Sequence, residues 1–130
     1  MTDFDRSTEL IVELAKAVVI EMRETYPGWK EAFIRMQADV GFFQAKCSFV
    51  VPTGVQILNV MAHKAFMEQV KRIGAELRLT LEHQRPFCVA ILRIGADLNY
   101  GMQYEYSDPD RWSITKINGG TGMPTGYTRA

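Results

Sequence analysis

The sequence predicts an α+β domain with two layers, in which two amphipathic helices pack on one face of an antiparallel meander sheet. Two segments, residues 7–25 and 63–84, repeat apolar residues with helical spacing, whereas the segments between and after them alternate apolar and polar residues. The order is helix, three strands, helix, two strands. It lacks the regular strand-helix-strand repeat of a parallel sheet. We expect the other face of the sheet to be partly open.

The composition is that of one soluble domain. The chain has 130 residues, of which 47% are apolar and 23% are charged, and its 15 Lys and Arg residues equal its 15 Asp and Glu residues. A net charge of zero argues against nucleic acid as a main partner, because phosphate binding requires a basic excess. No run reaches the roughly 18 apolar residues of a membrane span, and the N-terminus does not resemble a secretion signal. We therefore expect a cytoplasmic protein that binds neither nucleic acid nor membrane.

The first half of the chain predicts a helix followed by a three-stranded meander. Apolar residues return once per helical turn over residues 7–25, and a Pro-Gly pair then ends the helix. Residues 29–41 alternate apolar and polar side chains, and Gly41 allows a tight reversal into residues 43–51, which alternate in the same way. A third, short strand with mixed faces is expected over residues 55–61.

The second helix is predicted over residues 63–84 and ends before Pro86, since the residue before a proline is pushed out of helical geometry. Gly74 within this helix costs about 1 kcal/mol relative to Ala, which indicates a close approach of another backbone. Residues 87–94 form a continuous apolar run before Gly95, as expected for a central strand. The residues expected in the core include Leu14, Val18, Ile34, Phe49, Val70, Leu77, Val89 and Ile91.

A tyrosine-rich strand follows and runs into an acidic turn. Every second residue from 100 to 106 is Tyr or Met, so these side chains share one face of a strand. Large amphipathic rings beside acids are typical of a recognition surface, although the tyrosine face alone fits an ordinary buried strand better. Beyond the turn, Trp112 and Ile114 add a final short strand or an anchor. The acids, which have no Lys or Arg between them, are Asp97, Glu105, Asp108 and Asp110.

The chain is expected to form one domain over residues 1–117. Residues 118–130 are rich in glycine and poor in apolar side chains. We therefore expect a flexible tail, or one that becomes ordered with a partner. No internal repeat or interdomain linker is visible.

The sequence shows no catalytic or cofactor-binding arrangement. The two histidines, His63 and His83, lie at opposite ends of the second predicted helix, about 30 Å apart, so they cannot share a site on it. Cys47 and Cys88 lie in apolar runs without metal-ligand spacing and are expected to be free thiols. We expect no metal, no other cofactor and no enzymatic activity.

The chain resembles the YezG-like immunity proteins over residues 7–115. The resemblance rests on the order of elements, on the turn at residues 95–97 and on residues 104–108 followed by Trp112. Members of this family are small cytoplasmic antitoxins that protect bacteria from secreted polymorphic toxins, including contact-dependent inhibition toxins. The Gly-rich tail and the neutral net charge depart from the family pattern, since immunity proteins against basic nucleases are commonly acidic.

The resemblance implies that the chain binds and neutralises a toxin domain, expected to be a nuclease, by stoichiometric protein-protein inhibition. The last strand ends in aromatic and acidic residues. Together with the resemblance, this end points to an interface in which the acids face a basic patch on the toxin and the aromatic rings anchor the contact. The implied partner-binding residues are Tyr104, Glu105, Tyr106, Asp108, Asp110 and Trp112.

Two other readings are open. The exposed face of the second helix, with Lys71, Arg72 and Arg78, would instead suit an acidic partner. A different class of function is a small-molecule or metal-binding domain without catalytic activity. That domain would use the open sheet face, lined by the strand at residues 55–61.

Overall fold

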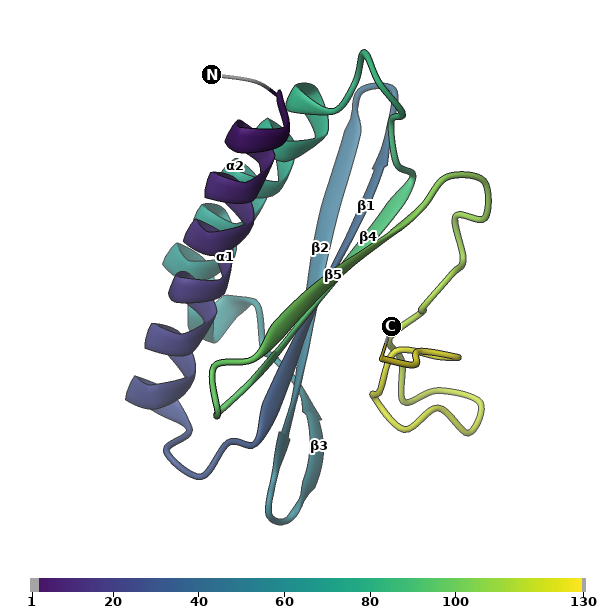
Figure 1. Ribbon diagram of the computed structural model, residues 1–130. Coiled ribbons are helices and arrows are strands. Elements are labelled where there is room, and N and C mark those ends of the chain that lie inside the picture. Colours follow the sequence, from purple (N-terminus) through teal and green to yellow (C-terminus); the bar gives the residue numbers. More distant parts are fainter. Residues whose placement is uncertain (1–2, 130) are drawn as a thin grey trace.

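The computed structural model describes residues 3–129, and within this range it contains two α-helices and one five-stranded antiparallel sheet (Figure 1). This confirms the predicted α+β class. No helix in the described range is long and apolar enough to span a membrane. In chain order the elements are α1 (Asp3–Thr25), β1 (Glu31–Asp39), β2 (Phe42–Val51), β3 (Gly54–Ile57), the 3-10 helix η1 (Met61–His63), α2 (Lys64–Thr80), β4 (Val89–Gly95) and β5 (Tyr100–Glu105).

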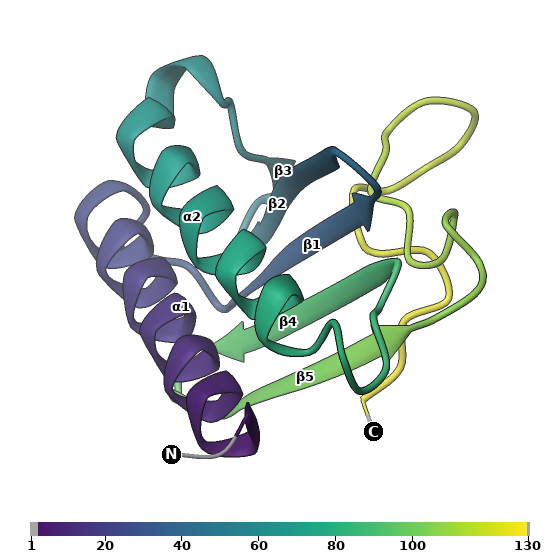
Figure 2. The ribbon, with the colours of Figure 1, turned by 90° about the horizontal axis from the view of Figure 1, so that it is seen from above.

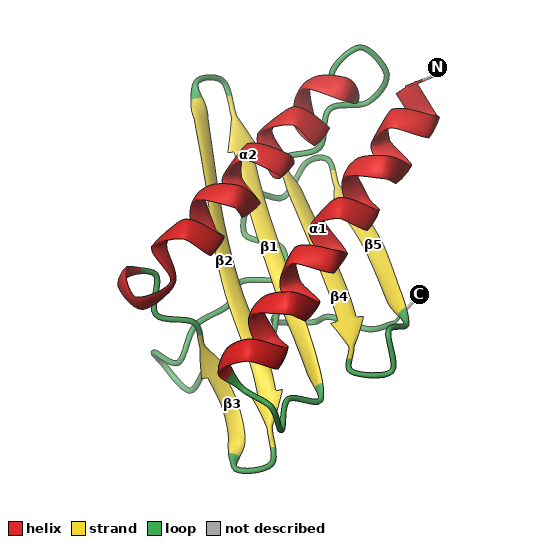
Figure 3. Ribbon diagram, turned by 90° about the vertical axis from the view of Figure 1, so that its left-hand side faces the viewer, coloured by secondary structure: helices red, strands yellow, loops and turns green. Residues whose placement is uncertain are grey.

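The strand order is β3-β2-β1-β4-β5, so β1 is the central strand and β5 is an edge. Ile34 of β1 lies opposite Cys47 of β2 and Leu92 of β4. Both helices lie on one face of the sheet (Figure 3), where α1 contacts β4 and α2 contacts β2. The strand predicted over residues 55–61 is shorter than expected, since Asn59 accepts hydrogen bonds from the amides that begin η1.

The main core lies between the helices and the sheet. All eight residues expected in the core are at most 1% exposed, which confirms the periodicities used to find them. Gly74 is buried in α2, and a Cβ atom there would collide with the ring of Phe43 and the sulfur of Met36. The close approach inferred at Gly74 is therefore made by side chains of the sheet, not by another backbone.

The second face of the sheet is less open than expected. Phe33, Val89 and Ile91 lie on this face, and Trp112 and Ile114 pack against them, each only 3% exposed. As a result β4 is buried along its whole length. Trp112 and Ile114 thus act as anchors and not as a further strand, and the molecule has a third layer on this side (Figure 2).

Residues 118–129 form no helix or strand, yet they pack against the sheet instead of extending from it. The ring of Tyr127 lies edge-on to Phe33, with 5.3 Å between the ring centroids. The side chain of Gln103 on β5 donates a hydrogen bond to the carbonyl oxygen of Thr128. Composition suggested a flexible tail because the segment is rich in glycine and poor in apolar residues. A few widely spaced apolar side chains are enough to attach it, and residue 130 lies outside the described range.

The core assignment is tested by two leucines two residues apart on α2. Leu77 is fully buried, whereas Leu79 is 64% exposed. We expect Leu77→Ala to lower the free energy of unfolding by about 2 to 5 kcal/mol, because it removes buried methyl groups and leaves a cavity. Leu79→Ala is expected to change it by no more than about 0.5 kcal/mol. Urea denaturation measures the free energy of unfolding of both variants. A similar loss for Leu77→Ala and Leu79→Ala would contradict the placement of α2.

Candidate protein-binding surface

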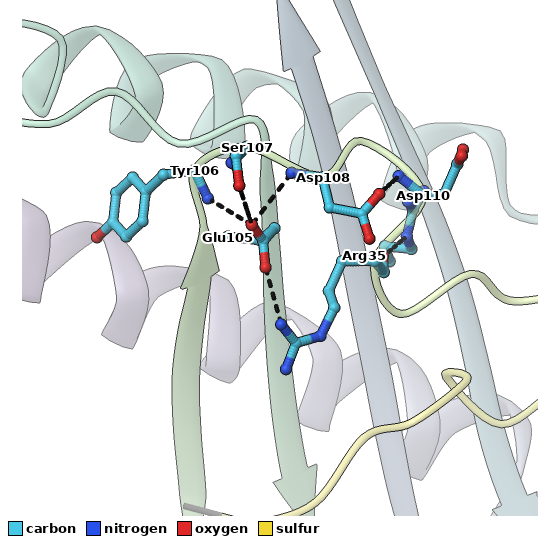
Figure 4. A network of polar contacts seen from close by, with 7 residues as sticks. Arg35, Glu105, Tyr106, Ser107, Asp108 and Asp110 are labelled. Carbon is cyan, nitrogen blue, oxygen red and sulfur yellow. Dashed lines mark hydrogen bonds and ion pairs between the residues drawn. The ribbon is translucent and has the colours of Figure 1, made fainter.

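The loop after β5 is organised around the carboxylate of Glu105 (Figure 4). One carboxylate oxygen accepts hydrogen bonds from the amides of Tyr106, Ser107 and Asp108 at 3.1 to 3.2 Å. The other oxygen accepts a hydrogen bond from the guanidinium of Arg111 at 2.8 Å. These bonds, with the amides of Ser107 and Asp108 contributing most, lower the pKa of Glu105 to about 2. Glu105 therefore holds the loop in shape and is not a free interface acid.

A buried arginine fixes the next part of the loop. Arg35 lies on β1, is 8% exposed, and donates hydrogen bonds to the carbonyl oxygens of Pro109 at 2.8 Å and Arg111 at 2.9 Å. Burial lowers the pKa of Arg35, while the nearby charges of Asp110 and Asp108 oppose this shift. The acids of the turn appeared uncompensated in the sequence. In the structure this is wrong for Glu105, which forms an ion pair with Arg111. The charge of Arg35 lies near Asp110 and Asp108, but Arg35 bonds to backbone carbonyls and not to these acids.

The structure separates the six predicted partner-binding residues into two groups. Trp112 is buried beneath the loop, and Glu105 is engaged as described above. Tyr104 is half-buried against the ring of Phe87, at 5.4 Å between centroids, and burial raises the pKa of Tyr104 to about 12. These three side chains support the fold. The exposed ones, which can meet a partner, are Tyr106, Asp108 and Asp110.

Apolar side chains that the sequence analysis did not single out are exposed at the same end of the sheet. Val40 at the β1-β2 turn is 97% exposed, Phe42 is 46% exposed and Leu79 at the end of α2 is 64% exposed. Tyr106, 36% exposed, lies on the loop after β5, with the guanidinium carbon of Arg85 3.7 Å from its ring centroid. We call this the hairpin-end surface, formed by Val40, Phe42, Leu79, Tyr106, Asp108 and Asp110.

Two grooves run through the hairpin-end surface. One, of about 430 Å³, is lined by Phe42, Phe87 and Tyr106 among others, and the second, of about 420 Å³, by Val40, Phe42 and Leu79 among others. They share Phe42 and Arg78, so they form one continuous concave area. The sequence contains one signal for this surface, which is the apolar residue on each side of Gly41. A solvent-exposed hairpin turn normally carries polar residues at these positions.

A polar network elsewhere joins His63 to two residues that the sequence analysis did not single out. His63 is 8% exposed, and its ring nitrogens lie 2.7 Å from a carboxylate oxygen of Glu21 and 3.0 Å from the hydroxyl of Tyr26. Acid, imidazole and hydroxyl groups in this order also occur in catalytic sites. Here the ring of Tyr26 packs on Phe49 at 4.2 Å between centroids, and none of the three residues lines either groove. The network ties the end of α1 to the start of α2.

The two cysteines are free thiols, as expected. Cys47 is buried, and burial raises its pKa to about 12, whereas Cys88 is half-buried beside the first groove. Among residues 3–129, no cluster of three or more His, Cys, Asp or Glu side chains is placed to hold a metal ion.

The role of Glu105 predicts a specific dependence of stability on pH. Its pKa in the folded chain, about 2, lies below its ordinary value of 4.5. The carboxylate therefore stabilises the fold above about pH 4.5, and this contribution is lost as the pH falls toward 2. We expect Glu105→Gln to lower the melting temperature at neutral pH and the difference from the unmodified chain to shrink near pH 3. Thermal unfolding followed across this range tests the prediction, and a pH-independent difference would contradict it.

Comparison with known proteins adds no assignment. A scan against models of protein families finds no match, and a search of characterised proteins finds no match either. The function must therefore be inferred from the hairpin-end surface and from the scaffold that presents it.

Proposed function

We propose that this chain is an immunity protein that binds and neutralises a cognate secreted or contact-dependent toxin domain, and that the hairpin-end surface is its binding site. The observation that carries the proposal is the exposed group of Val40, Phe42, Leu79 and Tyr106 beside two joined grooves. Contiguous apolar side chains rimmed by charge are typical of a protein-protein interface. The resemblance of the element order to YezG-like immunity proteins supports the same function.

Two exposed acids at the rim of this surface suit a toxin domain that acts on nucleic acid. Asp108 and Asp110 are exposed at the rim, and a nuclease presents a basic surface to the phosphates of its substrate. Acids at a rim mainly raise the rate of association and its sensitivity to salt, whereas buried apolar contacts set the lifetime of the complex. Val40 and Phe42 would therefore provide the stable contact, and the two aspartates would guide the approach.

The scaffold suits an inhibitor because the loop that carries the rim is held in one conformation. Glu105 and Arg35 together bond to five backbone groups of this loop, so little conformational entropy remains to be lost on binding. Stoichiometric inhibition needs such a preformed surface and no nucleophile or cofactor.

The other readings gain less support from the geometry. A small-molecule site on the second sheet face would need space that Trp112, Ile114 and Tyr127 fill in this structure. On the exposed face of α2, Arg72 is bonded to Glu13, and Arg78 donates a hydrogen bond to the carbonyl oxygen of Phe87. These two arginines are therefore partly engaged within the chain.

Two matched substitutions test the hairpin-end surface. Val40→Asp places an acid in the proposed apolar contact, and Met61→Asp makes the same kind of change at η1, where the side chain is 81% exposed. We expect Val40→Asp to weaken binding of the toxin domain at least about tenfold, or about 1.4 kcal/mol, and to reduce protection of cells that produce the toxin. Met61→Asp should leave both unchanged.

The adjacent coding sequences supply the toxin domain for this experiment, and titration calorimetry with the purified domain measures the affinity. Both variants should unfold at the same temperature as the parent chain, since both side chains are largely exposed. Equal affinity for the parent chain and Val40→Asp would place the interface elsewhere. If none of the neighbouring products binds or is neutralised, the proposed function itself is wrong.

A further inference from the structure

The outer edge of β5 lacks the features that usually protect an edge strand. Residues 100–105 contain no Lys, Arg or Pro, and the one acid, Glu105, is paired with Arg111. Natural edge strands are commonly shielded by charge, proline, a bulge or very short length. The opposite edge, β3, has only four residues, so β5 is the longer open edge of this sheet.

The register shows which backbone groups of β5 are available. The carbonyl oxygen of Asn99 accepts a hydrogen bond from Gly95, and that of Glu105 from Cys88, so the odd-numbered residues of β5 face β4. Backbone groups alternate in direction along a strand. Those of Tyr100, Met102 and Tyr104 therefore point away from the sheet, where the described residues provide no further strand.

An apolar groove of about 370 Å³ adjoins this edge, between α1 and the turn that connects β4 to β5. Its lining includes three large side chains with high exposure: Ile20 is 57% exposed, Leu98 is 52% exposed and Tyr100 is 46% exposed. The free edge and the exposed apolar side chains thus form one continuous area, distinct from the hairpin-end surface.

We propose that a second copy of this chain occupies the area, by antiparallel pairing of β5 with β5 about a two-fold axis at Met102. In this register Met102 faces its own equivalent, and Tyr100 of each copy faces Tyr104 of the other. All outward-pointing backbone groups then meet outward-pointing groups of the second copy. The two sheets join into one. Tyr104 of the second copy stays packed on its own Phe87, and its exposed side lies beside Tyr100 at the rim of the groove.

The charges along the edge favour a second copy as the occupant. A two-fold interface brings the same patch together from both sides, so it must be complementary to itself. Here Glu105 faces Asn99 of the second copy and Gly101 faces Gln103, and no like charges are opposed. The whole chain has a net charge of zero, which removes general repulsion between copies. The opposed tyrosines add a favourable cross-strand pair.

Substitutions at Gly101 test this proposal. Because Arg93 lies opposite Gly101 on β4, thermal unfolding of each variant is compared with that of the parent chain to check that the fold is retained. A Cβ atom at Gly101 meets nothing within 4 Å, and the residue does not have a positive φ angle. Gly101→Lys places two like charges near the axis and is expected to raise the dissociation constant of the dimer on the order of tenfold. Gly101→Thr adds a strand-favouring side chain without charge and should leave the dimer intact.

Sedimentation analysis over a concentration series measures the mass of the three proteins. We expect the parent chain and Gly101→Thr to approach twice the chain mass of 14.8 kDa at concentrations where Gly101→Lys remains a monomer. A parent chain that stays monomeric throughout overturns the proposal, as does a Gly101→Lys variant that dimerises equally well. If the chain is monomeric but Gly101→Lys weakens binding of the toxin domain, the edge serves that partner and self-association is again wrong.

A cross-linking experiment fixes the register. In the proposed register Met102 and its equivalent form a hydrogen-bonded antiparallel pair. The Cα atoms of such a pair are about 5.5 Å apart, within the range that a disulfide can bridge. Oxidation should therefore link Met102→Cys into a dimer. Val40→Cys should remain monomeric, although Val40 is 97% exposed and Met102 is only partly exposed. Dimers formed by Val40→Cys and not by Met102→Cys would show a different interface and overturn the proposed one.

Discussion

The buried guanidinium of Arg35 determines how the last quarter of this chain runs. A charged group in the middle of a central strand must have its hydrogen bonds satisfied, and Arg35 achieves this with the carbonyl oxygens of Pro109 and Arg111. These bonds carry the chain from the edge strand back across the sheet. Trp112 and Ile114 then reach Phe33 and cover the face opposite the helices. Without this cover, two interior strands would expose apolar side chains to water.

The same bonds connect the core to the proposed interface. Arg35 holds the far end of the loop and Glu105 holds its start, so Asp108 and Asp110 are presented from a loop with little freedom. The β1-β2 turn and the end of α2 reach the same end of the sheet (Figure 1). Binding would thus use a surface assembled from three parts of the chain, each supported by buried contacts.

Local patterns in the sequence were sufficient to predict the helices, the hairpin and the interior strand at residues 87–94. Each of these depends on the spacing of apolar residues within one segment. That spacing follows directly from which side of the helix or strand faces the core and which faces water. The class of fold followed from their order. The exposed turn at Val40 could have been recognised by its unusual apolar residue, but an apolar side chain beside Gly41 was assigned to the strand face instead.

The remaining features depend on contacts between distant residues, which no local pattern reveals. Arg35 and Pro109 are 74 residues apart, and His63 and Glu21 are 42 residues apart. Trp112 looked like a possible binding residue because large rings serve interfaces and cores equally well. Its burial depends on how the whole C-terminal segment runs. Residues 118–130 are rich in glycine and poor in apolar side chains, and this composition suggested that they would not pack.

The fluorescence of Trp112 tests this central role of the C-terminal segment most directly. The chain has two tryptophans, so Trp29→Phe leaves Trp112 as the only one. Because Trp112 is 3% exposed, its emission should be blue-shifted and strongly protected from acrylamide quenching in the native state. This protection should disappear on unfolding at the same urea concentration as the loss of helical circular dichroism. Native-state quenching as strong as that of the unfolded chain would show that the segment does not pack on the sheet.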